Sequence, residues 1–148
     1  MTDDESRWPI LTLRIVYDDL PDLIEVEARI VAGDWSGIAQ AYTSPHSLAQ
    51  EARGLLAWTA RPREEFALEA GADTGIGWIS LRWYMVDRAG HVACHVQIAT
   101  NECDARRPQG VRRLALEFPT EPALVERFAR QLVSLAESLV GEAVLAGT

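Results

Sequence analysis

Lysine is absent from the sequence, so arginine supplies all 14 basic residues, and 22 acidic residues outnumber them. The resulting formal charge of −8 disfavours nucleic acid as a partner, because affinity for a polyanion depends on basic side chains that neutralise its phosphates. The same negative charge speeds the encounter with a basic protein. The composition therefore favours a protein partner, and a basic protein is the best electrostatic match.

Cysteine is also scarce, with Cys94 and Cys103 as the two copies. Two cysteines are too few for a disulfide framework, which favours a reduced, cytoplasmic setting. No stretch combines a charged head with the apolar run of a signal peptide, and no apolar run approaches the length of a membrane span. We therefore expect a cytoplasmic protein that does not associate with a membrane.

Motifs for phosphate binding and nucleophilic catalysis are missing as well. Gly71, Gly75 and Gly77 have the spacing of neither a P-loop nor a dinucleotide fingerprint. Ser36 lies in Asp34-Trp35-Ser36-Gly37, which lacks the first glycine of a nucleophile elbow. We predict no catalytic residue, although a hydrolase assembled from residues distant in the sequence is a less favoured alternative.

His91, Cys94 and His95 lie close together in the sequence, as the ligands of a metal ion do. In a strand, however, Cys94 points to the face opposite the two histidines, and side chains four positions apart stand about 13 Å from each other. One ion does not bridge that distance unless the chain bends. We expect no metal site and no cofactor, and we interpret Cys94 as a small buried side chain.

Alternation of apolar and polar residues predicts short β-strands along most of the chain. The clearest case is the stretch 77–100, where two alternating runs flank a turn in which Gly90 supplies a positive φ. One face of this hairpin is apolar, with Trp83 and Val96 on it, and the other is polar, which is typical of an antiparallel sheet covered on one side. Further strands are predicted at 10–17, 23–31, 35–42, 64–70 and 111–118.

Two helices are predicted from stripes of apolar residues at helical spacing. The first begins after Ser44, an N-cap residue followed by proline, and the second begins at Pro122 and ends at Gly141. Similar segments, Thr43-Ser44-Pro45 and Thr120-Glu121-Pro122, lead into the two helices and are a faint sign of an internal repeat.

The predicted fold is α+β, with one antiparallel sheet of about six or seven strands and two helices packed on one face, in the order β-β-β-α-β-β-β-β-α. A chain of 148 residues fits a single domain, residues 1–148. Residues 1–8 and 143–148 are expected to be flexible tails. Gly37, inside a predicted strand, indicates a bulge or a close backbone approach.

The polar face of the predicted sheet is the candidate docking surface. Arginine and tyrosine are common anchors of protein interfaces, and both occur on this face. The candidate binding residues are Glu25, Glu27, Arg82, Tyr84, His95 and Arg113. The alternative interpretation is a solvated face whose charges pair with each other across strands.

Three segments together resemble a known kind of protein: the hairpin with Gly90-His91-Val92, the strand and helix from Trp35 to Leu56, and the final helix with Phe128-Ala129-Arg130-Gln131-Leu132. They look like an uncharacterised family of short bacterial α+β domains, akin to the immunity proteins of polymorphic toxin systems. No catalytic residue is carried over with this resemblance. It implies a non-enzymatic cytoplasmic protein that neutralises a partner by binding it.

Two functions from different classes follow. The first is a protein-binding domain, of the immunity type, that neutralises a basic toxin domain. The alternative is a small-molecule-binding domain or a small enzyme with a pocket between the sheet and the helices. A homodimer formed through an edge strand is compatible with either function.

Overall fold

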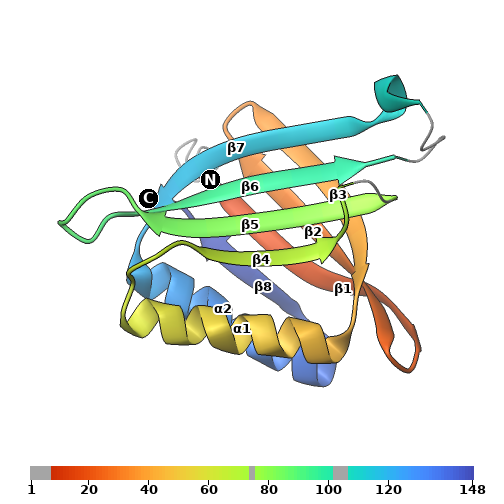
Figure 1. Ribbon diagram of the computed structural model, residues 1–148, viewed down its shortest axis with the longest axis horizontal. Coiled ribbons are helices and arrows are strands. Elements are labelled where there is room, and N and C mark those ends of the chain that lie inside the picture. Colours follow the sequence, from red (N-terminus) through yellow and green to blue (C-terminus); the bar gives the residue numbers. More distant parts are fainter. Residues whose placement is uncertain (1–7, 74–75, 102–106) are drawn as a thin grey trace, which may run out of the picture.

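The computed structural model describes residues 8–73, 76–101 and 107–148. These residues form two antiparallel sheets of four strands each and two α-helices, so the predicted α+β class is confirmed (Figure 1). The elements are β1 (Ile10–Leu20), β2 (Leu23–Ala32), β3 (Trp35–Thr43), α1 (Pro45–Ala60), β4 (Phe66–Gly71), β5 (Gly77–Met85), β6 (Val92–Thr100), β7 (Arg112–Thr120), α2 (Pro122–Ser138) and β8 (Glu142–Ala146).

The prediction of one sheet with six or seven strands is wrong. The strand order is β3-β2-β1-β8 in the first sheet, here called sheet A, and β4-β5-β6-β7 in the second, here called sheet B. Helix α1 carries the chain from sheet A to sheet B, so β3 and β4 do not pair although they are neighbours in the sequence of strands. Alternation reports which face of a strand is buried, and it does not report which sheet the strand joins.

The two halves of the chain have the same layout and exchange their last strands. Each half consists of a three-stranded meander, a helix and one more strand. Strand β4 pairs with β5 of the second half, and β8 pairs with β1 of the first half. Thr43 and Thr120 each end the third strand of a meander, so the faint sequence repeat corresponds to structurally equivalent positions.

The second predicted tail is therefore a strand. Ala143 and Leu145 of β8 are fully buried opposite Leu13 and Leu11 of β1. The predicted N-terminal tail, residues 1–8, lies outside the described residues except for Trp8.

The helix starts follow from local chemistry. The Ser44 side chain accepts a hydrogen bond from the backbone N–H of Ser47 at 3.0 Å, as predicted for an N-cap. Glu121 occupies the equivalent position before α2 but makes no capping bond with its side chain. The hydroxyl of Thr120 instead donates to the carbonyl of Ala146 at 2.9 Å and connects the end of β7 to β8.

The core lies where the two sheets converge on the helix pair, which runs along one side of the molecule (Figure 1). Trp83 is fully buried there, with ring centroids 6.4 Å from Phe66 and 6.0 Å from Phe128. Val96 is fully buried too, so the predicted apolar face of the hairpin is confirmed. Arg53 and Glu137 form an ion pair of 3.2 Å between the two helices.

Strand β3 crosses sheet B so closely that glycine is required at the crossing. A Cβ atom on Gly77 would overlap the backbone carbonyl oxygen of Gln40. A Cβ atom on Gly37 would lie 3.1 Å from a methyl group of Leu114. The register of β2 and β3 is continuous, so Gly37 marks a close approach and not a bulge.

Candidate functional site

The structure divides the predicted docking residues between two surfaces. Arg82, Tyr84, His95 and Arg113 lie on the outer face of sheet B, as their cross-strand partners show. Glu25 and Glu27 lie on the outer face of sheet A. The expectation of one continuous surface followed from the expectation of one sheet.

The outer face of sheet B carries charges that interact with each other. Arg82 forms an ion pair of 3.2 Å with Glu65 and approaches Nδ1 of His95 at 3.5 Å. Burial lowers the pKa of His95, and the positive charge of Arg82 lowers this pKa further. Both effects favour the neutral ring, whose Nδ1 can accept a hydrogen bond from Arg82.

Arg113 has similar local partners at the other end of this face. Its guanidinium lies 2.6 Å from the carboxylate of Asp73 and 6.0 Å from the ring centroid of Trp78. The indole N–H of Trp78 donates to Glu69 at 2.8 Å. Tyr84 is half-buried. Such pairing is typical of a solvated face, the alternative interpretation of these residues.

Glu27 lies at the centre of sheet A, and its neighbours bury it almost completely. Arg14 donates from Nε to one carboxylate oxygen at 2.9 Å, and Gln40 donates to the other at 2.8 Å. Only 7% of Glu27 is exposed. Burial raises its pKa, but the hydrogen bonds from Gln40 and Arg14 and the nearby arginine charges outweigh this effect and lower the pKa below its usual value. This carboxylate is held by its neighbours on the outer face of sheet A, and little of it is exposed to a partner.

Replacing Glu27 with glutamine is expected to lower the free energy of unfolding by about 1 kcal/mol at neutral pH, a modest value because Arg14 is half exposed. The lowered pKa means that the charged form stabilises the fold above pH 4.5 and that this contribution is lost as the pH falls through the pKa of the folded state. The free energies of unfolding of the unmodified protein and of Glu27→Gln, measured by urea titration, should therefore converge in acid. The control is Glu142→Gln, because Glu142 lies on the same cross-strand row of sheet A. If the free energy of unfolding of Glu27→Gln stayed below that of the unmodified protein in acid, the stabilising role of the charged Glu27 carboxylate would be contradicted.

Glu25 has a different environment, because two tyrosines flank it. It pairs with Tyr17 of β1 on one side and with Tyr42 of β3 on the other. Its hydrogen bond with the Tyr42 hydroxyl, together with its negative charge, raises the pKa of Tyr42. Tyr17 and Tyr42 are 43% and 46% exposed. The Glu25 carboxylate and two partly exposed rings therefore form one row across strands β1, β2 and β3.

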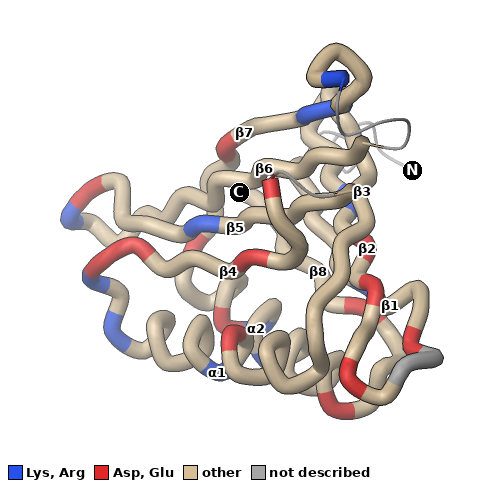
Figure 2. Tube along the Cα trace, turned by 45° about the vertical axis from the view of Figure 1, so that its right-hand side comes forward, with Lys and Arg blue, Asp and Glu red and all other residues tan. Residues whose placement is uncertain are grey.

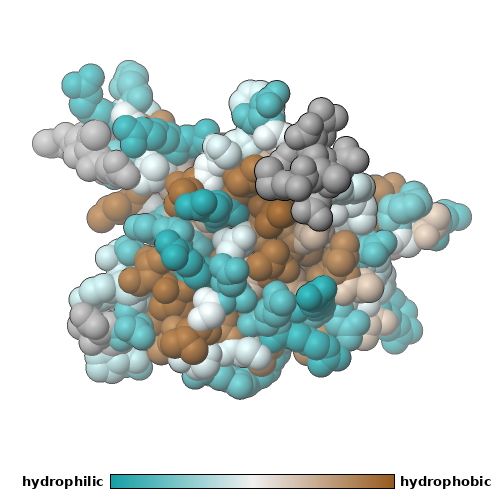
Figure 3. Space-filling model, turned by 180° about the vertical axis from the view of Figure 1, so that it is seen from behind, coloured by the Kyte–Doolittle hydropathy of each residue, from teal (hydrophilic) through white to brown (hydrophobic). Residues whose placement is uncertain are grey.

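A hollow of about 280 Å³ lies beside this row, between β3 and the start of β5. We call it the tyrosine hollow, and its lining residues are Glu25, Ile38, Ala39, Gln40, Tyr42, Ile76, Gly77 and Thr100. Ile38 is 47% exposed and Ile76 is 73% exposed. Seen from behind, the molecule shows apolar side chains in patches between hydrophilic ones (Figure 3). The hollow thus combines one carboxylate, an aromatic ring and aliphatic surface.

Sequence reasoning found Glu25 but missed Ile38, Tyr42 and Ile76. A usable signal existed for two of them, since Ile38 and Tyr42 fall on the polar side of the predicted strand 35–42. Ile76 had no such signal, because it lies between strands. The region between sheets and helices, where the alternative function places a ligand, is filled by Trp83, Phe128 and other fully buried side chains.

The part of the chain that the structure describes holds neither a group of metal-ligating side chains nor a membrane-spanning helix. No three side chains of histidine, cysteine, aspartate or glutamate are grouped to hold a metal ion among these residues. Cys94 is buried, and burial raises the pKa of its thiol. Neither α1 nor α2 is apolar enough over a sufficient length to cross a membrane.

No family model, no curated protein and no solved structure matches this chain.

Proposed function

We propose that this chain is a non-enzymatic protein-binding domain of the immunity type, and that it binds a basic protein through the tyrosine hollow. The observation that carries the proposal is the Glu25 carboxylate beside Tyr42 in a hollow bordered by two exposed isoleucines. Interface anchors are typically aromatic or aliphatic side chains around a pocket, with a charged group that selects the partner.

The composition of the hollow selects an arginine or lysine side chain as the anchor of the partner. Glu25 supplies the opposite charge, and Tyr42 in the hollow and Tyr17 beside it supply aromatic rings, which attract a cation. Ile38 and Ile76 provide apolar surface for the aliphatic stem of such a side chain.

Other acidic residues near the tyrosine hollow add to the negative charge of Glu25. Acidic residues gather where β1 joins β2, including the exposed Asp18 and Asp22 (Figure 2). The whole chain carries a formal charge of −8. A basic protein is therefore attracted at long range and oriented towards this end of sheet A.

Tagged protein should capture one basic protein in a one-to-one ratio from the cytoplasm of its source. With the purified pair, Tyr42→Ala is expected to weaken binding by about 30-fold, because an interface anchor contributes 2 kcal/mol or more. Glu25→Gln should weaken binding about tenfold and reduce its dependence on salt. Isothermal titration calorimetry at two salt concentrations measures both effects.

The matched control is Glu117→Gln, which removes an exposed carboxylate from the outer face of sheet B and should leave the affinity unchanged. Absence of a stoichiometric protein partner would overturn the proposal. A partner whose affinity responds to Glu117→Gln but not to Tyr42→Ala or Glu25→Gln would equally refute it, because binding would then use sheet B.

A further inference from the structure

A second and larger hollow lies between β3, an edge strand of sheet A, and β7, an edge strand of sheet B. Its volume is about 510 Å³, within the range of small-molecule sites. The two strand segments that border it, residues 35–39 and 112–115, are equivalent in the two halves of the chain. We call this hollow the β3–β7 groove.

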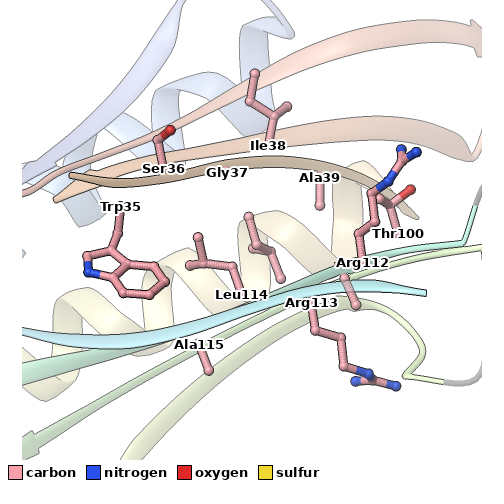
Figure 4. Close-up of a pocket in the computed structure, with 12 residues that line it drawn as sticks. Trp35, Ser36, Gly37, Ile38, Ala39, Thr100, Arg112, Arg113, Leu114 and Ala115 are labelled. Atoms are coloured by element: carbon pink, nitrogen blue, oxygen red, sulfur yellow. The ribbon is translucent and has the colours of Figure 1, made fainter. Parts of the chain in front are cut away.

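The floor of the groove is apolar and is shaped by Gly37. Because this residue has no side chain, β3 approaches Leu114 and Ile98, whose methyl groups would lie 3.1 and 3.2 Å from a Cβ atom at this position. Figure 4 shows Leu114 in the space between the two strands. A ligand in the groove therefore lies on aliphatic side chains in its middle portion.

The two ends of the groove differ in chemistry. Trp35 lies at one end with its indole directed from β3 towards β7, and it is 71% exposed (Figure 4). Arg112 and Thr100 lie together at the other end (Figure 4). Arg113 also borders the groove, but its side chain points away from it. The groove thus presents an aromatic face, an aliphatic floor and a cationic end in that order.

The charge of this groove contrasts with that of the molecule. Its described lining residues include Arg112 and no carboxylate, whereas Glu25 lines the tyrosine hollow. Arg113, which points away, is paired with Asp73. Basic residues mark the start of β7 (Figure 2). Arg112 is engaged in another interaction, but a guanidinium has several N–H donors and binds more than one acceptor.

We infer that the β3–β7 groove binds an amphipathic carboxylate with an aromatic end, such as an arylalkanoic acid. The ring of the ligand stacks on Trp35, its methylene chain covers Gly37 and Leu114, and its carboxylate accepts hydrogen bonds from Arg112 and Thr100. The five residues from Trp35 to Ala39 span about 13 Å, which matches a ring and carboxylate separated by several methylene groups. This groove shares Ile38, Ala39 and Thr100 with the tyrosine hollow, but Trp35 and Arg112, which select its ligand, do not line that hollow.

The probe is 6-phenylhexanoate, and 6-phenylhexanamide is its neutral counterpart. Calorimetry on the full chain is expected to show one site with a dissociation constant of about 0.1 mM for the acid and about tenfold weaker binding of the amide. Trp35→Ala should weaken binding of the acid about tenfold through lost stacking. Arg112→Gln should remove the preference for the acid over the amide.

Two variants serve as controls. Trp8→Ala removes another exposed tryptophan, and Arg130→Gln removes an exposed arginine of α2; neither residue lines the groove. Both should bind 6-phenylhexanoate as the unmodified protein does. Lack of binding at millimolar concentration, equal binding of acid and amide, or full affinity in Trp35→Ala would each overturn the inference.

Discussion

Replacing Trp83 with alanine is expected to lower the free energy of unfolding by about 3–5 kcal/mol, the range found when a large buried aromatic side chain is truncated. Trp83 is fully buried and contacts rings from two other elements, Phe66 of β4 and Phe128 of α2. Its removal leaves a cavity where sheet B meets the helix pair. Chemical denaturation followed by circular dichroism measures the loss.

Two further variants separate cavity formation from other effects. Trp35→Ala changes the same residue type at a position that is 71% exposed, and it should cost less than about 1 kcal/mol. The indole N–H of Trp83 has no hydrogen-bond partner among the described residues, so Trp83→Phe removes an unsatisfied donor and should cost at most about half as much as Trp83→Ala. Equal losses for Trp83→Ala and Trp35→Ala would contradict the packing described above.

Substitution of Gly77 by alanine is the second large effect, with an expected loss of about 3 kcal/mol. The new Cβ atom would overlap the carbonyl oxygen of Gln40, and a backbone atom has little freedom to move aside. Strand β3 would have to withdraw from sheet B at this point. Thermal or urea unfolding of the purified variant tests this expectation.

Gly33→Ala is the matched control. Gly33 has a φ of +62°, and no described atom lies within 4 Å of an added Cβ, so its substitution costs about 1 kcal/mol of left-handed backbone strain alone. If Gly77→Ala were no more destabilising than Gly33→Ala, the close crossing of β3 over sheet B would be refuted.

Local patterns predicted most of the elements, whereas long-range pairing was beyond them. The alternation around Trp83 and Val96 identified the buried face correctly, because side-chain direction in a strand depends only on position. Strand β8 was missed because it offers just five residues, of which Ala143 and Leu145 are buried. Its partner β1 lies at the opposite end of the chain, and no local signal reports such a pairing.

The candidate site shows the same division between local and long-range information. The polar side of the predicted strands included Glu25, and its place on an outer face follows from alternation alone. The tyrosine hollow, however, combines residues from β2, β3 and the segment before β5. Ile76 joins Tyr42 because β3 crosses sheet B at Gly77, and that crossing depends on the packing of two sheets.

The exchange of β4 and β8 determines the smallest fragment that can fold. A fragment ending after β4 would leave β1 without its outer neighbour, and β4 would have no strand beside it. Gly147 and Thr148 make backbone hydrogen bonds to both halves of the chain. The N–H of Gly147 donates to the carbonyl of Pro9 at 2.8 Å, and the N–H of Thr148 donates to the carbonyl of Pro119 at 2.9 Å. Two copies of such a fragment could satisfy each other by swapping strands, so severing the chain between α1 and β5 should yield intertwined dimers or unfolded peptide, never an isolated compact half.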